Sequence, residues 1–164
     1  MDLYIVRHGK AGKRVGDPSA DSGRTLTKGG RKEVRAVAKW LSATAPPPDW
    51  IATSPLPRAR ETAEIVAGKW GIPGEVEEWD ELFPGHEPSA VLSRVSRMPA
   101  GSTGAIVGHE PQLSGILSLL ACGNWTLRVA LAKGGVARVA GIDPDGGTSG
   151  TLEWLVSPSL LCGG

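Results

Sequence analysis

The sequence has little cysteine, no excess of charge of either sign and no apolar run long enough to cross a bilayer. Two cysteines occur in 164 residues, with no CxxC pair, so neither a disulfide framework nor a metal site is predicted. A net charge of +1 gives no broad electrostatic attraction for nucleic acid. The longest strongly apolar stretch, 113–122, is too short for a membrane span, and the N-terminus shows no signal-peptide pattern. We therefore expect a cytoplasmic protein without nucleic-acid or membrane partners.

Aromatic residues are also scarce, apart from tryptophan. The chain has one Tyr, one Phe and six Trp. Five tryptophans fall near the ends of expected elements or within apolar patterns, which favours packing in the core or at its rim: Trp40, Trp50, Trp70, Trp79 and Trp154. With 40% hydrophobic residues, a chain of this length can bury the core of one ordinary domain. We expect a single domain over residues 1–164, and a monomer.

Strand-like and helix-like patterns alternate through residue 122. Short apolar runs predict strands at 3–6, 50–53, 76–79 and 104–108. Apolar residues at three- and four-residue spacing predict helices that begin near Gly29 (capped by Thr27), Pro57, Pro88 and Leu113. This alternation predicts an α/β fold, a three-layer α/β/α sandwich with a mainly parallel sheet.

After Trp125 the apolar period changes to two. Residues 127–131, 136–142 and 152–156 follow this pattern, which is typical of strands. A turn signal at 143–147 lies between the last two runs, so these runs are expected to pair antiparallel. The sheet should therefore have an antiparallel C-terminal edge.

Basic and histidine side chains follow three of the predicted parallel strands. Arg7 and His8 end the first strand, Ser54 and Arg58 follow the second, and His109 follows the fourth. Because ligands bind beyond the carboxyl ends of parallel strands, we expect these side chains to converge there. Two guanidiniums and two imidazoles without metal-ligand spacing suit a tetrahedral dianion.

Each of these residues has a simpler interpretation when it is taken alone. Arg7 and His8 could simply be solvent-exposed residues after a strand, and His109 could be a core or capping residue. Arg58 could form a surface salt bridge with Glu61 or Glu64. A P-loop NTPase is excluded, because residues 9–13 lack the GxxxxGK[ST] spacing.

Three stretches, in this order, resemble the motifs of the histidine phosphatase superfamily, also called the phosphoglycerate-mutase-like superfamily. They are Arg7-His8-Gly9, residues 54–63 and Gly108-His109-Glu110. Within the superfamily, Arg24-Thr25-Leu26-Thr27 and the turn Lys133-Gly134-Gly135 resemble the SixA-type phosphohistidine phosphatases. The resemblance runs from about residue 2 to residue 157.

The resemblance implies a phosphatase without metal or cofactor, with His8 as a nucleophile that carries the phosphoryl group covalently. The residues implied to bind the phosphoryl oxygens or the substrate are Arg7, Arg24, Ser54, Arg58 and His109. Positively charged donors around phosphorus would stabilise the charge that spreads over its oxygens during transfer. For a neutral nitrogen of His8 to face phosphorus, a hydrogen-bond acceptor must hold the proton on the other ring nitrogen. The sequence does not show which group this acceptor is.

The proton donor to the leaving group is the open point. Larger members of the superfamily supply a glutamate, and Glu81 is our candidate here, with Glu110 and His86 behind it. A solvated loop carboxylate explains Glu81 equally well. A phosphorylated imidazole needs a weaker acid than an ester does, because its leaving nitrogen is protonated far more easily than an alkoxide.

Three functions are compatible with these residues. The first is hydrolysis of phosphohistidine on a signalling or phosphotransfer protein, since 164 residues leave no room for a cap over small substrates. The second is hydrolysis of small phosphomonoesters by the same chemistry. The third is a non-catalytic domain that binds phosphate or acts as a scaffold. A mutase is disfavoured, because returning a phosphoryl group requires a closed site.

Overall fold

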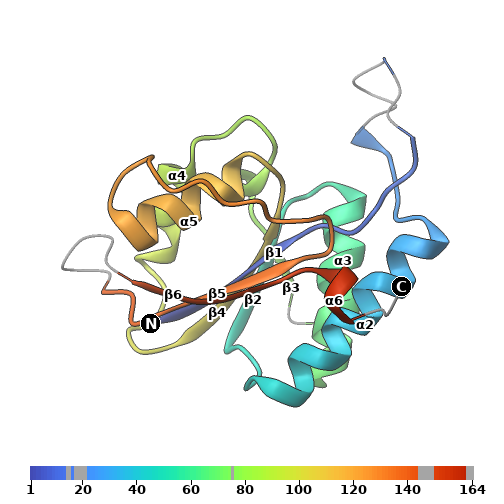
Figure 1. Ribbon diagram of the computed structural model, residues 1–164, viewed down its shortest axis with the longest axis horizontal. Helices are drawn as coiled ribbons and strands as arrows, with labels where there is room; N and C mark the ends of the chain where they lie inside the picture. Colours follow the sequence, from blue (N-terminus) through green and yellow to red (C-terminus); the bar gives the residue numbers. More distant parts are fainter. Residues whose placement is uncertain (14–15, 17–21, 75, 144–149, 162–164) are drawn as a thin grey trace.

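The computed structural model describes residues 1–13, 16, 22–74, 76–143 and 150–161. Its centre is a six-stranded sheet with the order β3-β2-β4-β1-β5-β6 (Figure 1). The strands are β1 (Asp2–Arg7), β2 (Trp50–Thr53), β3 (Val76–Glu78), β4 (Thr103–Gly108), β5 (Val136–Ala140) and β6 (Thr151–Val156). Neighbours from β3 to β1 are parallel, whereas β5 and β6 are antiparallel. The predicted mainly parallel sheet with an antiparallel C-terminal edge is confirmed.

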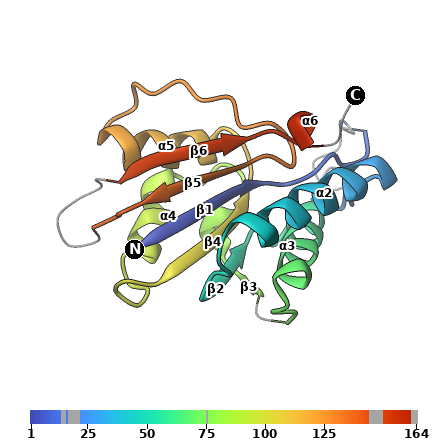
Figure 2. The same ribbon diagram turned by 60° about the horizontal axis from the view of Figure 1, so that its bottom comes forward.

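Helices cover both faces of this sheet. One face carries α2 (Lys28–Thr44) and α3 (Pro57–Trp70), with the short α6 (Pro158–Leu161) near α2, and the other carries α4 (Pro88–Val95) and α5 (Gln112–Cys122) (Figures 1 and 2). Side chains of β1 alternate between the two cores: Leu3 and Ile5 pack with α4 and α5, and Tyr4 and Val6 pack with α2 and α3. The three-layer sandwich is confirmed. No helix among the described residues has the length and apolar character of a membrane span.

Local sequence signals explain where the helices near the sheet edge begin and end. The Thr27 hydroxyl accepts a hydrogen bond from Gly30 N at 3.0 Å and so caps α2. Pro57 occupies the first turn of α3, where a missing N–H costs nothing. Gly71 ends α3 with φ of 78°, a left-handed conformation that favours glycine. Thr27 and Pro57 thus fix where the loops that follow β1 and β2 end, and Gly71 ends α3 before β3.

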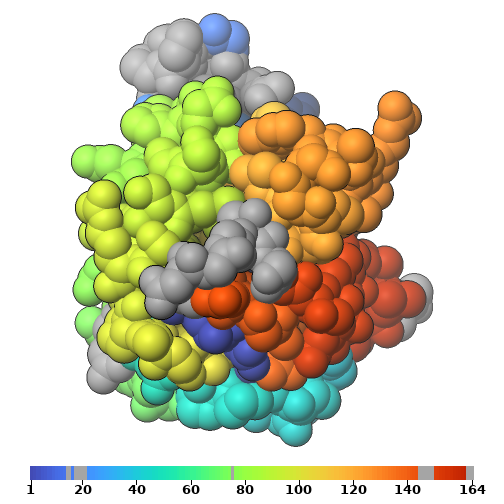
Figure 3. Space-filling model, turned by 90° about the vertical axis from the view of Figure 1, so that its left-hand side faces the viewer, coloured from blue at the N-terminus to red at the C-terminus, as the bar shows by residue number. Residues whose placement is uncertain are grey.

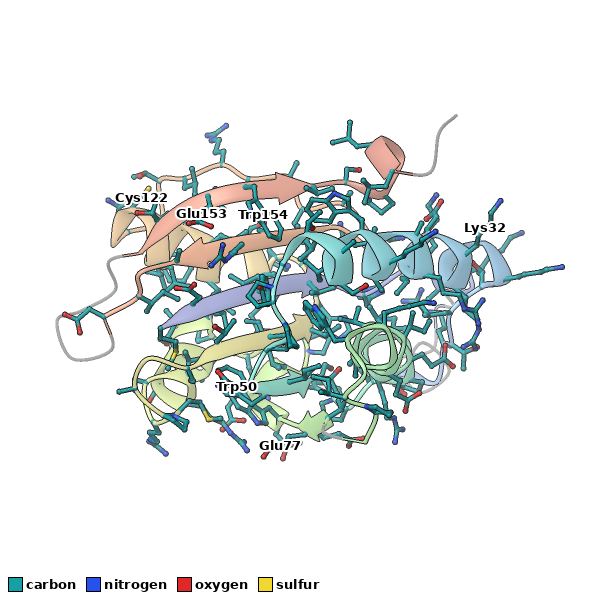
Figure 4. The ribbon with its side chains drawn as sticks, turned by 90° about the horizontal axis from the view of Figure 1, so that it is seen from below. Lys32, Trp50, Glu77, Cys122, Glu153 and Trp154 are labelled. Atoms are coloured by element: carbon teal, nitrogen blue, oxygen red, sulfur yellow. The ribbon has the colours of Figure 1, made fainter. Side chains whose placement is uncertain are left out.

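The five tryptophans expected to pack are buried or half-buried. Trp154 projects from β6 over the sheet face that α2 covers (Figure 4), where its ring lies 6.2 Å from that of Tyr4 and 5.3 Å from that of Trp40. On the other side of the sheet, Trp50 stacks on the fully buried Trp79 at 5.4 Å. The packing interpretation is confirmed for these residues.

The predicted strand at 127–131 is wrong. This segment is irregular and lies outside the sheet, alongside α5. Its backbone groups bond to side chains of other elements: Leu127 N donates to Ser118 Oγ at 3.0 Å, Ser114 Oγ donates to Val129 O at 3.2 Å, and Arg7 Nη1 donates to Leu131 O at 2.8 Å. These bonds satisfy the backbone without a strand partner. Most of the turn predicted at 143–147 lies outside the described residues.

Candidate active site

Three parallel strands end at one edge of the sheet and bring the predicted residues to it. The register places Arg7 of β1 opposite Gly108 of β4, so His8 and His109 follow their strands at the same level. Their ring centroids lie 4.9 Å apart. Ser54 directly follows β2, the neighbour of β4 on the other side. The sheet topology thus brings together residues that lie far apart in the chain.

A cavity of about 510 Å³ lies at this edge, and we call it the basic cavity. Its positively charged lining residues are Arg7, Lys13, Arg24, Arg58 and Lys133. His8 and His109 also line it, and Glu110 is its only acidic residue among those that the structure describes. Within that same part of the chain, no group of three or more His, Cys, Asp or Glu could hold a metal ion. The arrangement suits an anion with several oxygens.

Arg58 lies in the first turn of α3 with 5% of its surface exposed. Among the described residues it forms no ion pair with Glu61 or Glu64, the partners that the simpler interpretation required. Glu61 instead pairs with Arg31 at 2.9 Å. Arg58 therefore directs a permanent charge toward the cavity that it lines.

His8 is held as a neutral imidazole with a defined tautomer. Its Nδ1 lies 2.7 Å from Gly9 O, and a carbonyl oxygen can only accept, so Nδ1 carries the proton and Nε2 keeps a free lone pair. Burial, followed by the charges of Arg58 and Arg7, lowers the pKa of His8 to about 4. Near neutral pH the ring is therefore an uncharged imidazole with a free lone pair among cations.

His109 is held by the residue that follows β2. Its Nε2 lies 2.9 Å from Ser54 Oγ, and both side chains are buried. Burial, together with the nearby His8 and Arg58, lowers the pKa of His109 to about 2. Ser54 was predicted to bind phosphate, but it is not among the described residues that line the basic cavity. Its position instead suits a role in orienting the His109 ring.

The turn Lys133-Gly134-Gly135 supports the backbone of the Arg-His pair. Gly134 N donates to Arg7 O at 3.1 Å and to His8 O at 3.0 Å, and Arg7 N donates to Gly135 O at 3.0 Å. Gly134 has φ of 75°, which favours glycine. In the sequence this turn stands out as the link between two runs of period two and through the resemblance, but neither signal gave it a supporting role.

Thr62 is a second supporting residue that sequence analysis missed. It is fully buried in α3, where its Oγ1 accepts from Gly9 N at 3.1 Å and donates to Arg58 O at 2.7 Å. This hydroxyl joins the loop that follows His8 to the helical turn that carries Arg58. The sequence placed Thr62 in the apolar stripe of the helix and within the family-like stretch 54–63, but gave it no role of its own.

We expect Thr62→Val to lower the free energy of unfolding by about 1–3 kcal/mol, because it leaves the buried Gly9 N–H without an acceptor. Thr62→Ser keeps the hydroxyl and should cost less. Thr44→Val removes a similar hydroxyl that donates to Trp40 O at 2.8 Å, but at an exposed position, so its effect should be small. Denaturant unfolding of the three variants measures this, and an equal loss for Thr62→Val and Thr44→Val would contradict the assignment.

Acid should destabilise the fold through His8 and His109. Both pKa values lie below the unfolded value of 6.5, so the unfolded chain takes up these protons first as the pH falls. Stability is complete above pH 6.5 and falls below it, by about 2 kcal/mol per histidine at pH 5. Denaturant unfolding at pH 7 and pH 5 measures the difference. In the double variant His8→Asn/His109→Asn, most of this difference in stability between pH 7 and pH 5 should disappear, whereas His86→Asn should keep it. A double variant that lost as much stability at pH 5 as the wild-type protein would contradict this account.

The structure does not bring Glu81 to the basic cavity. Glu81 lies in the short helix η1 (Asp80–Leu82), and its carboxylate pairs with Arg94 at 2.9 Å. Its own backbone N–H and Arg94 hold its pKa below the usual range, which is the wrong direction for a proton donor. Of the other two candidates, His86 is exposed and lines a different cavity, whereas Glu110 lines the basic cavity. The candidate donor is therefore Glu110.

Comparison with known families agrees with this geometry. A family model described as "Histidine phosphatase superfamily (branch 1)" matches residues 3–85. The matched segment includes Arg7, His8 and Arg58, while His109 lies beyond it.

Two sequence relatives and one solved structure match nearly the whole chain. The chain is 32% identical, over 169 aligned positions, to an uncharacterized protein of Picosynechococcus sp., covering 98% of this chain and 99% of that protein. It is 28% identical over 164 positions to phosphohistidine phosphatase SixA of Escherichia coli, covering 98% and 96%. A structure of the protein histidine phosphatase SixA complexed with tungstate matches with a TM-score of 0.85 and 28% identity, covering 98% of this chain and 99% of that one.

Proposed function

Since the chain belongs to the histidine phosphatase superfamily, we propose that it hydrolyses phosphohistidine on a partner protein through a phosphorylated His8. Its similarity to SixA over nearly its full length supports a phosphatase of this superfamily. The finer assignment, to a protein-borne phosphoimidazole, rests on the chemistry of the basic cavity. The expected partner is a signalling or phosphotransfer protein.

The proposed reaction has two displacements at phosphorus. In the first, the lone pair of His8 Nε2 forms a bond to phosphorus while the bond from phosphorus to the substrate imidazole breaks, and the leaving nitrogen takes up a proton. In the second, water attacks the phosphorylated His8, the new bond breaks, and inorganic phosphate and the free imidazole of His8 are released. Arg7, Arg58 and His109 would hold the phosphoryl oxygens in both steps, where charge spreads over those oxygens.

The observation that carries the proposal is the state of His8. A carbonyl oxygen at 2.7 Å fixes its proton on Nδ1, and the depressed pKa of about 4 keeps the ring neutral. A nucleophilic nitrogen needs both conditions. A domain that only bound phosphate would gain more from a charged imidazolium, so the neutral ring favours turnover over scaffolding.

The test is a side-by-side activity panel with a chelator present. The substrates are a chemically phosphorylated histidine protein, a phosphotyrosine peptide and small sugar phosphates. We expect the phosphohistidine protein to be dephosphorylated fastest and the chelator to have no effect. Rapid hydrolysis of sugar phosphates with phosphohistidine left intact would instead identify a small-molecule phosphomonoesterase. Loss of activity with chelator would overturn the metal-independent mechanism.

Glu110→Gln and Glu81→Gln form a matched pair for the proton donor. Because Glu110 lines the basic cavity, its change should slow hydrolysis of a phosphate ester by about a hundredfold. Phosphohistidine hydrolysis should slow much less, because imidazole leaves with weaker acid assistance. Glu81→Gln should leave both rates within about twofold, as expected of a surface ion pair. Steady-state rates on both substrates decide this, and a larger loss for Glu81→Gln would reverse the assignment.

A further inference from the structure

A second cavity lies directly beside the basic cavity. It has a volume of about 390 Å³ and is lined by residues 85–88, residues of the 111–118 stretch, Trp125 and Leu127, and we call it the aromatic pocket. Pro84 and Glu110 line the basic cavity, while their chain neighbours Gly85 and Pro111 line the aromatic pocket. Figure 3 shows the two wall segments, coloured lime-green and orange, meeting on one face of the molecule. A partner that extends from the basic cavity along Pro84–Gly85 and Glu110–Pro111 would reach this pocket.

The pocket presents an exposed aromatic ring on an apolar floor. Trp125 is 60% exposed, which is unusual for so large an apolar side chain. A Cβ atom on Gly115 would lie 2.8 Å from Trp125 Cζ3 and 2.7 Å from Pro88 Cγ. Glycine at this position thus allows the indole and the proline ring to approach α5 closely. Such a floor can hold the methylene chain of a long side chain.

The polar groups of the pocket are mainly acceptors. Gln112 uses its Nε2 to donate to Glu81 O at 2.7 Å and to His86 O at 3.0 Å. Its Oε1 is buried and has no hydrogen-bond partner within the described residues. Glu87 is exposed, and no ion pair of Glu87 occurs in that part of the chain. An unsatisfied buried acceptor is uncommon, and this one belongs to a residue in the wall of the pocket.

The pocket hydroxyls cannot serve a ligand as readily. Ser118 Oγ donates to Asn124 O at 2.6 Å, and Ser114 Oγ donates to Val129 O at 3.2 Å. Their protons are therefore already used within the protein. Apart from the His86 ring, the pocket offers a ligand an aromatic face and a carboxylate. This chemistry is the opposite of that in the basic cavity.

We propose that the aromatic pocket binds a lysine or arginine side chain of the phosphohistidine protein. This inference rests on the proposed function, because it places that cation beside the phosphoimidazole in the basic cavity. The cation lies against the indole of Trp125 and near the Glu87 carboxylate, and its methylene chain packs over Pro88. The protein thus recognises a partner that carries a phosphoryl dianion and a cationic side chain next to each other. Small phosphate metabolites without a basic group lack the second contact.

The test is a positional scan with histidine peptides phosphorylated by phosphoramidate. Each peptide carries one lysine, placed from four residues before to four residues after the phosphohistidine, and a matched peptide has norleucine at the same position. We expect lysine at one or two positions to raise kcat/KM by about tenfold through a lower KM, and norleucine to give no such gain. Free phosphohistidine reports the basal reaction.

Two variants test whether the lysine gain depends on the aromatic pocket or on exposed apolar side chains in general. Trp125→Ala should remove the lysine gain without changing turnover of free phosphohistidine. Leu160→Ala, which truncates another exposed apolar side chain (74% exposed) on α6, should keep the gain. The proposal is overturned if no lysine position gives a gain, if norleucine matches lysine, or if the gain survives in Trp125→Ala.

A separate binding measurement distinguishes failure of this inference from failure of the proposed function. If the wild-type protein left free phosphohistidine intact, the proposed function would fail. The pocket would still be tested with unphosphorylated lysine peptides, by following the indole N–H signal of Trp125 in NMR spectra. We expect this signal to shift with the lysine peptides and not with the norleucine peptides, and equal behaviour of the two sets would refute the pocket assignment.

Discussion

Replacing His8 with alanine is expected to lower phosphohistidine hydrolysis by at least about a thousandfold, since the proposed carrier of the phosphoryl group is then missing. His8 is the neutral imidazole whose Nε2 lone pair is left free by the bond from Nδ1 to Gly9 O. Arginines can bind a phosphoryl group but cannot form the covalent bond. The wild-type protein, quenched in denaturant at alkaline pH during turnover, should contain acid-labile phosphate. His8→Ala should contain none.

The matched control is His86→Ala. His86 is exposed and does not line the basic cavity, so turnover of free phosphohistidine should stay within about twofold of wild type. Circular dichroism of His8→Ala would verify that its fold is retained. Acid-labile phosphate trapped on His8→Ala in the wild-type amount would move the nucleophile to another residue. Wild-type activity in His8→Ala would exclude covalent catalysis by this site.

Replacing Arg58 with alanine is expected to lower kcat/KM by about a hundredfold to a thousandfold, with losses in both kcat and phosphate affinity. Arg58 is 5% exposed and lines the basic cavity, where water cannot easily replace its charge. Arg58→Lys should recover only part of the loss, because an ammonium lacks the planar fork that holds two oxygens at once. Steady-state kinetics and competitive inhibition by tungstate measure the two effects.

Arg60→Ala is the control on the same helix. Arg60 forms an exposed ion pair with Glu78 at 3.0 Å, and its removal should leave both measurements near wild type. If Arg58→Ala bound tungstate as tightly as the wild-type protein and retained its kcat, the mechanism would lose its main cationic contact. A loss of equal size in Arg60→Ala would indicate a general effect on α3 rather than a role of Arg58 in the site.

Much of the fold could be predicted because its signals are local. The apolar period of each segment, the Thr27 cap and the prolines that begin α3 and α4 depend only on neighbouring residues. The order of polar residues after the strands was also readable, because parallel strands deliver their carboxyl ends to one edge. The segment 127–131 shows the limit of such signals. Its alternation is real, but side chains of α5 and Arg7 take its backbone bonds, so it never pairs as a strand.

The glutamate candidates show the same limit within the site. Glu81 and Glu110 were both expected in loops, and their sequence neighbours do not reveal which one faces the anion. The structure separates them, since Arg94 pairs with Glu81 while Glu110 lines the basic cavity. Thr62 was missed for a related reason. Its hydrogen bond to Gly9 spans 53 residues, and no local pattern records such a contact.

By itself, the sequence determined most of the elements that form and which reactive groups follow the strands, because both depend mainly on residues close together in the chain. Only the tertiary structure decided the state of those groups. The low pKa of His8, the burial of Arg58, the contact of Ser54 with His109 and the choice between the glutamates all depend on segments that meet after folding. Distance and burial between such segments set the charge and orientation of a side chain, and a linear sequence contains neither quantity directly.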